Sequence, residues 1–163
     1  MQDIANQIGI KLLKNKQTIA TAESCTGGNI AHQITLIPGS SAWYKGSIIS
    51  YACEVKENIL KVPHQQIETY GVVSTQVAES MANGVRTLLN VDYAIATTGI
   101  AGPTGGNEQT PVGTVCIAIA TPQKVVSKTI IAGNQRHQNI ETFTHEALKF
   151  LLNEITVSDC NKQ

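Results

Sequence analysis

Apolar residues recur along the chain at two different spacings, and together they predict alternating helices and strands. Residues 3–16 carry apolar side chains every third or fourth position, which is typical of an amphipathic helix, and residues 17–23 form a short strand-like run. A helix is predicted over 29–34, and a strand over 43–52, where β-branched and aromatic residues are concentrated. The first part of the chain therefore alternates helix and strand.

The second part of the chain continues this alternation and then breaks it. Short helical pieces are predicted at 54–61 and 64–70, and Ser74 is a predicted N-cap for a long helix. The remaining predictions are a strand over 92–98, a hairpin of 113–120 with 125–131, and a last amphipathic helix over 137–155. Because two strands finally follow each other directly, we predict an α/β fold, a three-layer α/β/α sandwich with a mixed sheet.

The composition fits one domain with a core built from aliphatic side chains. The chain has 163 residues, of which 42% are hydrophobic and only 4% aromatic. Its 12 basic and 12 acidic residues leave no net charge, so no nucleic-acid partner is expected. No apolar run approaches the roughly 20 residues of a membrane span, and the N-terminus lacks a secretory pattern. We expect a single domain over residues 1–156 and a polar tail, 157–163, with fraying from Thr156.

The cysteines and histidines are scattered rather than grouped. Cys25, Cys53, Cys116 and Cys160 are widely spaced and form no CxxC pair, which suits free thiols in a reducing cytoplasm. The chain has neither an HxH nor an HExxH pattern. We therefore expect a cytoplasmic protein that uses no metal.

Three glycine-bearing loops follow predicted strands, after Glu23, after Thr98 and after Ile131. Ligands of open α/β sheets bind outside the carboxyl ends of the strands, so these loops are expected to surround one pocket. In the first loop Ser24 stands at the strand end, and the backbone N–H groups of Thr26, Gly27 and Gly28 open a helix. Such groups can bind a phosphate or stabilise an oxyanion. The alternative is a serine N-cap followed by glycines that only make the turn.

Two candidates for proton transfer follow the strand over 43–52. Tyr51 lies at its end, and Lys56 lies about one turn into the next helix, so both can face the same pocket. A partly desolvated lysine has a lowered pKa and can act as a base, although a solvated surface lysine is the alternative. Cys25 is a second candidate nucleophile, but no histidine stands at a spacing that would activate it. A small neighbour of Ser24 is therefore the favoured interpretation of Cys25.

The second and third loops supply the predicted substrate contacts. Small residues allow the backbone to approach a ligand closely, and a guanidinium can bind a phosphate. The predicted substrate-binding residues are Thr98, Gly99, Gly102, Gly105, Asn134 and Arg136. The alternatives are a long structural turn for the second loop and a solvated arginine at a helix start for the third.

These segments resemble successive signatures of the CinA C-terminal domain family. The resemblance runs through AESCTGG at 22–28, PGSSAWY at 38–44, GVVS at 71–74, TGIAGP at 98–103 and PVGTV at 111–115. It covers roughly residues 5–152, and the AESCTGG and GIAGP segments are highly specific.

The resemblance implies a reaction and a set of residue roles. Family members carry this domain either alone, as expected here, or behind a molybdopterin-binding-like domain. Active members hydrolyse nicotinamide mononucleotide to nicotinate mononucleotide and ammonia, with no metal and no cofactor. Ser24 matches the family nucleophile, and Tyr51 and Lys56 match its activating pair. Related domains also suggest a homodimer.

The chain departs from the family pattern at two places beside the predicted pocket. Cys53 stands where the usual form has an amide side chain. The last loop, 133–136, is one residue longer than usual, and Glu141 lies near the place of a second arginine. These departures bear on phosphate affinity and leave two functions open. One is the nicotinamide mononucleotide amidohydrolase, and the other is a catalytically silent nucleotide-binding module with a regulatory role in competence or DNA damage.

Overall fold

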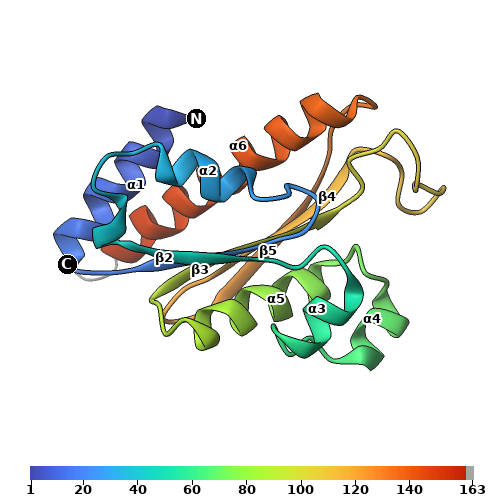
Figure 1. Cartoon of the computed structure of the whole chain (residues 1–163), viewed down its shortest axis with the longest axis horizontal. Helices are drawn as coiled ribbons and strands as arrows, with labels where there is room; N and C mark the ends of the chain where they lie inside the picture. Colours follow the sequence, from blue (N-terminus) through green and yellow to red (C-terminus); the bar gives the residue numbers. More distant parts are fainter. Residues whose placement is uncertain (161–163) are drawn as a thin grey trace.

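A computed structural model describes residues 1–160 and places one five-stranded sheet between two layers of helices (Figure 1). The strands are β1 (Ile19–Glu23), β2 (Tyr44–Ile49), β3 (Tyr93–Gly99), β4 (Thr114–Ala120) and β5 (Val125–Ile131). The helices are α1 (Gln2–Asn15), α2 (Asn29–Thr35), α3 (Cys53–Asn58), α4 (His64–Tyr70), α5 (Thr75–Leu88) and α6 (Arg136–Cys160), with a 3-10 turn, η1, at Ser40–Ala42.

The direction of the strands brings most of their carboxyl ends to one edge. The order is β2-β1-β3-β4-β5; β1 is parallel to both β2 and β3, whereas β4 is antiparallel to both β3 and β5. The carboxyl ends of β1, β2, β3 and β5 therefore lie at the same edge. This arrangement confirms the predicted α/β/α sandwich with a mixed sheet, including the β4–β5 hairpin.

Large and small side chains are segregated between the two faces of the sheet. On one face, isoleucines such as Ile95 and Ile117 pack beneath α1, α2 and α6. On the other face, alanines such as Ala96 and Ala118 pack against α5. Side chains alternate between faces along a strand, so one sequence repeat builds both layers. The alanines allow α5 to lie close to β1, β3 and β4, while α3 and α4 flank it (Figure 1).

Helix α5 begins where the sequence predicts. The Val77 backbone N–H donates to Ser74 Oγ at 3.3 Å, so Ser74 is the N-cap. Val77, Met81 and Val85 follow at four-residue spacing and are fully buried against the sheet. The cap and the apolar stripe together position the loop that precedes α5 beside the carboxyl end of β3.

Helix α6 corrects the predicted end of the last helix. The prediction ended at residue 155 with fraying from Thr156, but α6 continues to Cys160. The extra turn is held against α1, because Asn15 Nδ2 donates to Asp159 Oδ1 at 2.7 Å and Lys11 Nζ lies 3.7 Å from Asp159 Oδ2. The last part of the predicted tail, residues 161–163, lies outside the described residues.

Candidate active site

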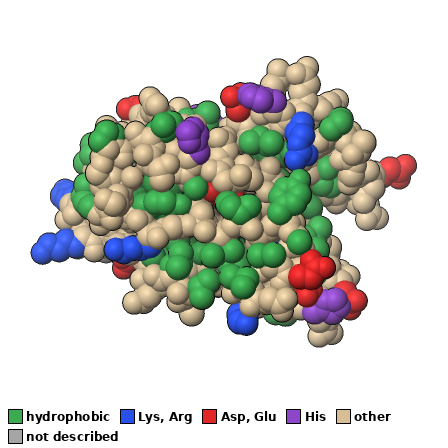
Figure 2. Space-filling model, in the orientation of Figure 1, with side chains coloured by type: hydrophobic (Ala, Val, Ile, Leu, Met, Phe, Trp, Pro, Cys, Tyr) green, Lys and Arg blue, Asp and Glu red, His purple; other side chains and the backbone are tan. Residues whose placement is uncertain are grey.

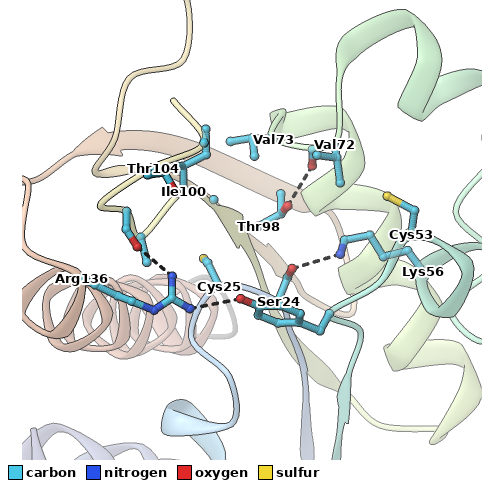
Figure 3. A pocket seen from close by; sticks show the side chains of 15 residues that line it. Ser24, Cys25, Cys53, Lys56, Val72, Val73, Thr98, Ile100, Thr104 and Arg136 are labelled. Atoms are coloured by element: carbon cyan, nitrogen blue, oxygen red, sulfur yellow. Dashed lines mark hydrogen bonds between the residues drawn. The ribbon is translucent and has the colours of Figure 1, made fainter. Parts of the chain in front are cut away.

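The loops after β1, β2 and β3 and the start of α6 surround one pocket of about 270 Å³ (Figure 3). It brings together Ser24, Tyr51, Lys56, Thr98, Gly99, Gly102, Gly105 and Arg136 from the predicted residues. Cys25, Cys53, Val72 and Val73 also line it. The parallel strands explain this convergence, because segments far apart in the sequence end at the same edge of the sheet.

Ser24 and Lys56 are in direct hydrogen-bond contact within this pocket. Lys56 Nζ lies 3.0 Å from Ser24 Oγ, and it also donates to the backbone carbonyl oxygen of Ser50 at 2.5 Å. Ser24 itself is tied to β3, since its backbone N–H donates to the Thr97 carbonyl oxygen at 3.0 Å. The pair is therefore held by two strands and a helix.

Lys56 is a buried amine without a charged partner. Its side chain is only 1% exposed, and both hydrogen-bond acceptors that it reaches in the described part of the chain are uncharged. Desolvation by burial lowers the pKa of Lys56 from its ordinary value, although the nearby Cys53 and Cys25 thiols oppose the shift. A lysine in this environment supplies a larger neutral fraction near neutral pH than a surface lysine does.

Glu23 holds the turn that carries Ser24. Its carboxylate is fully buried and accepts backbone N–H groups from Gly28 (3.0 Å), Ile30 (3.1 Å) and Ala31 (2.9 Å) at the start of α2. It also accepts the hydroxyl of Thr26 at 2.7 Å. A carboxylate at a helix N-terminus satisfies unpaired N–H groups and complements the helix dipole. Glu23 thus fixes the whole segment from β1 into α2.

This arrangement corrects the oxyanion prediction for the glycines. The Gly28 N–H is already bound to Glu23, and the Gly27 N–H donates to the Ser24 carbonyl oxygen at 3.1 Å. Thr26, Gly27 and Gly28 line a different cavity, between α2 and the start of α6, and not the pocket that holds Lys56. The Glu23 carboxylate therefore binds the N–H groups at the start of α2, where the sequence predicted a phosphate or an oxyanion.

Tyr51 and Arg136 close one side of the pocket mouth. Arg136 Nη2 donates to the Tyr51 hydroxyl oxygen at 3.1 Å, and Nη1 donates to the Gly102 carbonyl oxygen at 2.9 Å (Figure 3). The Tyr51 side chain is 63% exposed. Its hydroxyl bonds to Arg136 rather than to Ser24 or Lys56 in this structure, so Tyr51, a predicted candidate for proton transfer, has no direct contact with that pair.

The glycine loop after β3 requires small residues for close packing. A Cβ on Gly99 would lie 2.5 Å from the Thr114 carbonyl oxygen, and Gly102 has a φ of 86°. The Thr98 hydroxyl donates to the Val72 carbonyl oxygen at 2.8 Å.

Asn134 does not line the pocket that contains Ser24. The predicted substrate contact of Asn134 therefore has no counterpart in this pocket.

The two cysteines at the pocket differ sharply in exposure. Burial raises the pKa of the Cys25 thiol to about 12, mainly through desolvation. Since the thiolate is the reactive form, Cys25 is a poor nucleophile near neutral pH. Cys53, by contrast, is exposed at the first position of α3 and lines the same pocket as Lys56.

Among residues 1–160, no three histidine, cysteine or carboxylate side chains are grouped as metal ligands are. None of the helices in that range is both long and apolar enough to cross a bilayer. On the face drawn in Figure 2, acidic and basic side chains are scattered rather than gathered into a patch of one sign.

Comparison with known proteins identifies the family of this chain. Its sequence matches the CinA C-terminal domain over residues 1–155. The chain belongs to the CinA C-terminal domain family. A CinA-like protein of Flavobacterium psychrophilum is 48% identical over 148 residues, or 91% of this chain and 35% of the relative. A CinA-like protein of Desulfosudis oleivorans is 43% identical over 146 residues, or 89% and 35%. The chain thus spans about a third of the length of these relatives.

Solved structures of family members share the fold. The competence/damage inducible protein CihA of Agrobacterium tumefaciens is 35% identical with a TM-score of 0.90, covering 93% of this chain and 94% of that one. A CinA superfamily protein of Escherichia coli is 30% identical with a TM-score of 0.87, covering 93% and 90%. The family prediction made from the sequence signatures is confirmed.

Two contributors to the site escaped the sequence reasoning. Ser50 contributes its backbone carbonyl oxygen, and a pattern of side chains cannot predict such a contact. Glu23 belongs to the AESCTGG signature but was assigned only to a strand. An acidic residue at the last position of a buried strand, just before a helix, is the signal that would have found it, because buried charges need partners.

Proposed function

We propose that this chain hydrolyses the carboxamide of nicotinamide mononucleotide to give nicotinate mononucleotide and ammonia. The observation that carries the proposal is the 3.0 Å contact between Lys56 Nζ and Ser24 Oγ in a buried pocket at the strand ends. Membership of the CinA C-terminal domain family supports it, because the segments whose resemblance implies amidohydrolase activity surround that pair.

The first half of the reaction forms an acyl-enzyme. Neutral Lys56 retains a lone pair, which accepts the proton of the Ser24 hydroxyl while Oγ attacks the amide carbon. The tetrahedral intermediate then collapses as Lys56 returns the proton to the amide nitrogen. The carbon–nitrogen bond breaks and ammonia leaves. The carbonyl oxygen of Ser50 fixes the amine throughout by accepting one of its N–H groups.

The oxyanion is assigned to a different donor from the one the sequence suggested. The Cys25 backbone N–H directly follows the nucleophile, and within residues 1–160 it contacts only the thiol of its own residue and donates to no other residue. In hydrolases with a nucleophile at a strand-to-helix turn, the N–H of the following residue commonly serves in this way. A single such donor contributes about 3 kcal/mol to the transition state.

The second half of the reaction consumes one water molecule. Lys56 removes a proton from the water, and the resulting hydroxide attacks the ester carbon. The carbon–Oγ bond breaks, and Ser24 recovers its proton from Lys56. The net change is one amide and one water converted to one carboxylic acid and one ammonia, and no metal takes part.

Arg136 and the glycine loop hold the rest of the nucleotide. Arg136 lies at the pocket mouth with its guanidinium already oriented by Gly102 and Tyr51. A pre-organised guanidinium suits a phosphate oxygen, because little side-chain entropy remains to be lost on binding. The pyridine ring then lies between this arginine and Ser24.

The test is release of ammonia from nicotinamide mononucleotide by the purified protein, with and without EDTA. We expect stoichiometric ammonia and nicotinate mononucleotide, unaffected by chelation. The Ser24→Ala protein serves as the matched negative control. If the native protein binds the nucleotide but releases no ammonia, the amidohydrolase assignment fails, and a silent nucleotide-binding module becomes the better interpretation.

A further inference from the structure

A second cavity adjoins the catalytic pocket on the side of helix α4. It encloses about 400 Å³ and shares Val72, Val73, Ile100 and Gly105 with the catalytic pocket. Figure 3 shows Val72, Val73 and Ile100 along the upper wall of that pocket, above Ser24. A ligand bound at Ser24 can therefore extend over this wall into the second cavity.

The catalytic pocket alone is small for a nucleotide. Its volume of about 270 Å³ is just below that of typical ligand pockets, which enclose roughly 300–1,000 Å³. The adjoining cavity extends the available space well into that range. The combined space is suited to a ligand that is longer than a single nucleotide.

The second cavity has the chemistry of a site for an uncharged planar group. Among the residues that line it there is no lysine, arginine, histidine, aspartate or glutamate. It presents the half-exposed ring of Tyr70, the amides of Asn107 and Gln109, and the hydroxyls of Thr69 and Thr110. A phosphate would be poorly held without a cation, whereas a heterocyclic base can stack on a ring and bond to amides.

The amide groups of this cavity are available to a ligand. Asn107 Oδ1 accepts backbone N–H groups from Gln109 (3.0 Å) and Thr110 (2.7 Å), which fixes the side chain and leaves its Nδ2 as a donor. The side-chain amide of Gln109 has no hydrogen-bond partner within residues 1–160, and it offers both a donor and an acceptor. Together these groups match the mixed hydrogen-bonding edge of a base.

We propose that this cavity binds the second base of a pyridine dinucleotide, so that the carboxamide of such a dinucleotide is also a substrate. The inference rests on the proposed function, because it places the pyridine carboxamide at Ser24. The bridging phosphates would follow the segment from Gly102, where Arg136 is bound, to Gly105, which lines both cavities. The reaction is unchanged: water replaces the amide nitrogen, and ammonia leaves.

The experiment measures binding in the Ser24→Ala background, where no turnover interferes. Calorimetry compares nicotinamide mononucleotide with oxidised nicotinamide adenine dinucleotide, before and after the change Tyr70→Ala. A lost base–aromatic stack weakens binding at least about fivefold. We expect that loss for the dinucleotide and a change within about twofold for the mononucleotide. Tyr70→Phe keeps the ring and should restore dinucleotide binding.

Gln65→Ala is the matched control, because Gln65 lies on α4 beside Tyr70 but outside this cavity. It should leave both affinities unchanged. The inference is overturned if the dinucleotide shows no binding at millimolar concentration, or if Tyr70→Ala weakens both ligands equally or neither.

Ammonia release from the mononucleotide by the native protein is measured separately. Its absence, together with Tyr70-dependent dinucleotide binding, would overturn the proposed function and the substrate role of the dinucleotide, and would leave only the second subsite as a binding site. Its presence, together with Tyr70-independent binding, would overturn the subsite alone.

Discussion

Glu23 and Ser24 are consecutive residues whose side chains contact helices on opposite faces of the sheet. The Glu23 carboxylate binds the N–H groups at the start of α2, whereas Ser24 Oγ contacts Lys56 of α3. The alternation of side chains along β1 produces this division. One residue therefore anchors the turn and the next presents the hydroxyl, so a change in the first is expected to disturb the second.

We predict that Glu23→Gln lowers both stability and activity. Glutamine removes the negative charge from the start of α2 and turns a donor toward N–H groups that need acceptors. A loss of about 1–3 kcal/mol in the free energy of unfolding is expected from such a buried, charge-assisted network. Turnover should fall more than affinity, because the turn that carries Ser24 loosens. Urea unfolding and steady-state kinetics measure both effects.

Glu54→Gln is the control for that change. Glu54 is an exposed carboxylate in the first turn of α3, so its replacement should alter stability by less than about 0.5 kcal/mol. Equal effects of the two substitutions would contradict the anchoring role of Glu23.

Ser24→Ala should abolish ammonia release while the fold and nucleotide binding persist. The change removes only a hydroxyl whose partner is Lys56 Nζ. Loss of the nucleophile in a covalent mechanism costs several orders of magnitude in rate. Circular dichroism and calorimetry check the fold and binding, and Ser41→Ala, at an exposed serine, serves as the control. Residual activity within about tenfold of the native rate would rule Ser24 out.

Lys56→Arg should reduce kcat as severely as Lys56→Ala. Arginine keeps the positive charge but does not lose its proton, so it cannot accept one from Ser24. A lysine that only clamped a phosphate would tolerate arginine with a raised KM and little change in kcat. The same exchange at exposed Lys61 provides the control. Retention of most of kcat in Lys56→Arg would disprove the general-base role.

The lowered pKa of Lys56 also predicts how stability depends on pH. Because burial favours the neutral amine in the folded state, the unfolded chain binds more protons between the folded pKa and the ordinary value of 10.5. Stability contributed by this group therefore rises with pH through that interval. We expect the native protein to gain stability relative to Lys56→Met as the pH increases from neutral towards 10.5. Paired denaturant titrations across this range measure the difference, and a gap that stays constant would show that the pKa is not lowered.

Iodoacetamide should inhibit the proposed release of ammonia through Cys53 and not through Cys25. Cys53 is exposed at the pocket, so an added carboxamidomethyl group obstructs access to Lys56. Cys25 is buried and its pKa of about 12 leaves almost no thiolate. Inhibition should survive in Cys25→Ala and disappear in Cys53→Ser, while Cys160→Ser, at the far end of α6, changes nothing. Loss of ammonia release in Cys25→Ala would instead favour a thiol mechanism.

The sequence predicted those features that depend on periodicity and on strand ends. The apolar run at β3, the hairpin of β4 with β5 and the helix capped by Ser74 were each predicted as the correct element. The convergence of Ser24 and Lys56 followed from the shared edge of parallel strands. What the sequence did not disclose is how individual polar groups are paired. The Gly28 N–H was assigned to a ligand, yet Glu23 occupies it, and the Tyr51 hydroxyl turns to Arg136. Such pairings depend on backbone geometry over less than an ångström, which residue spacing does not encode.

The position of β1 between β2 and β3 determines when the pocket at the strand ends can form during folding. Ile19 of β1 pairs with Tyr93 of β3, a partner far along the chain, and Arg136 reaches the pocket only with the last helix. Contacts between distant parts of a chain form slowly, because the entropy cost of closing a long loop is met before the contacts stabilise the chain. Recovery of turnover during refolding should therefore lag behind recovery of helical signal, and a nascent chain released before α6 would be an inert intermediate.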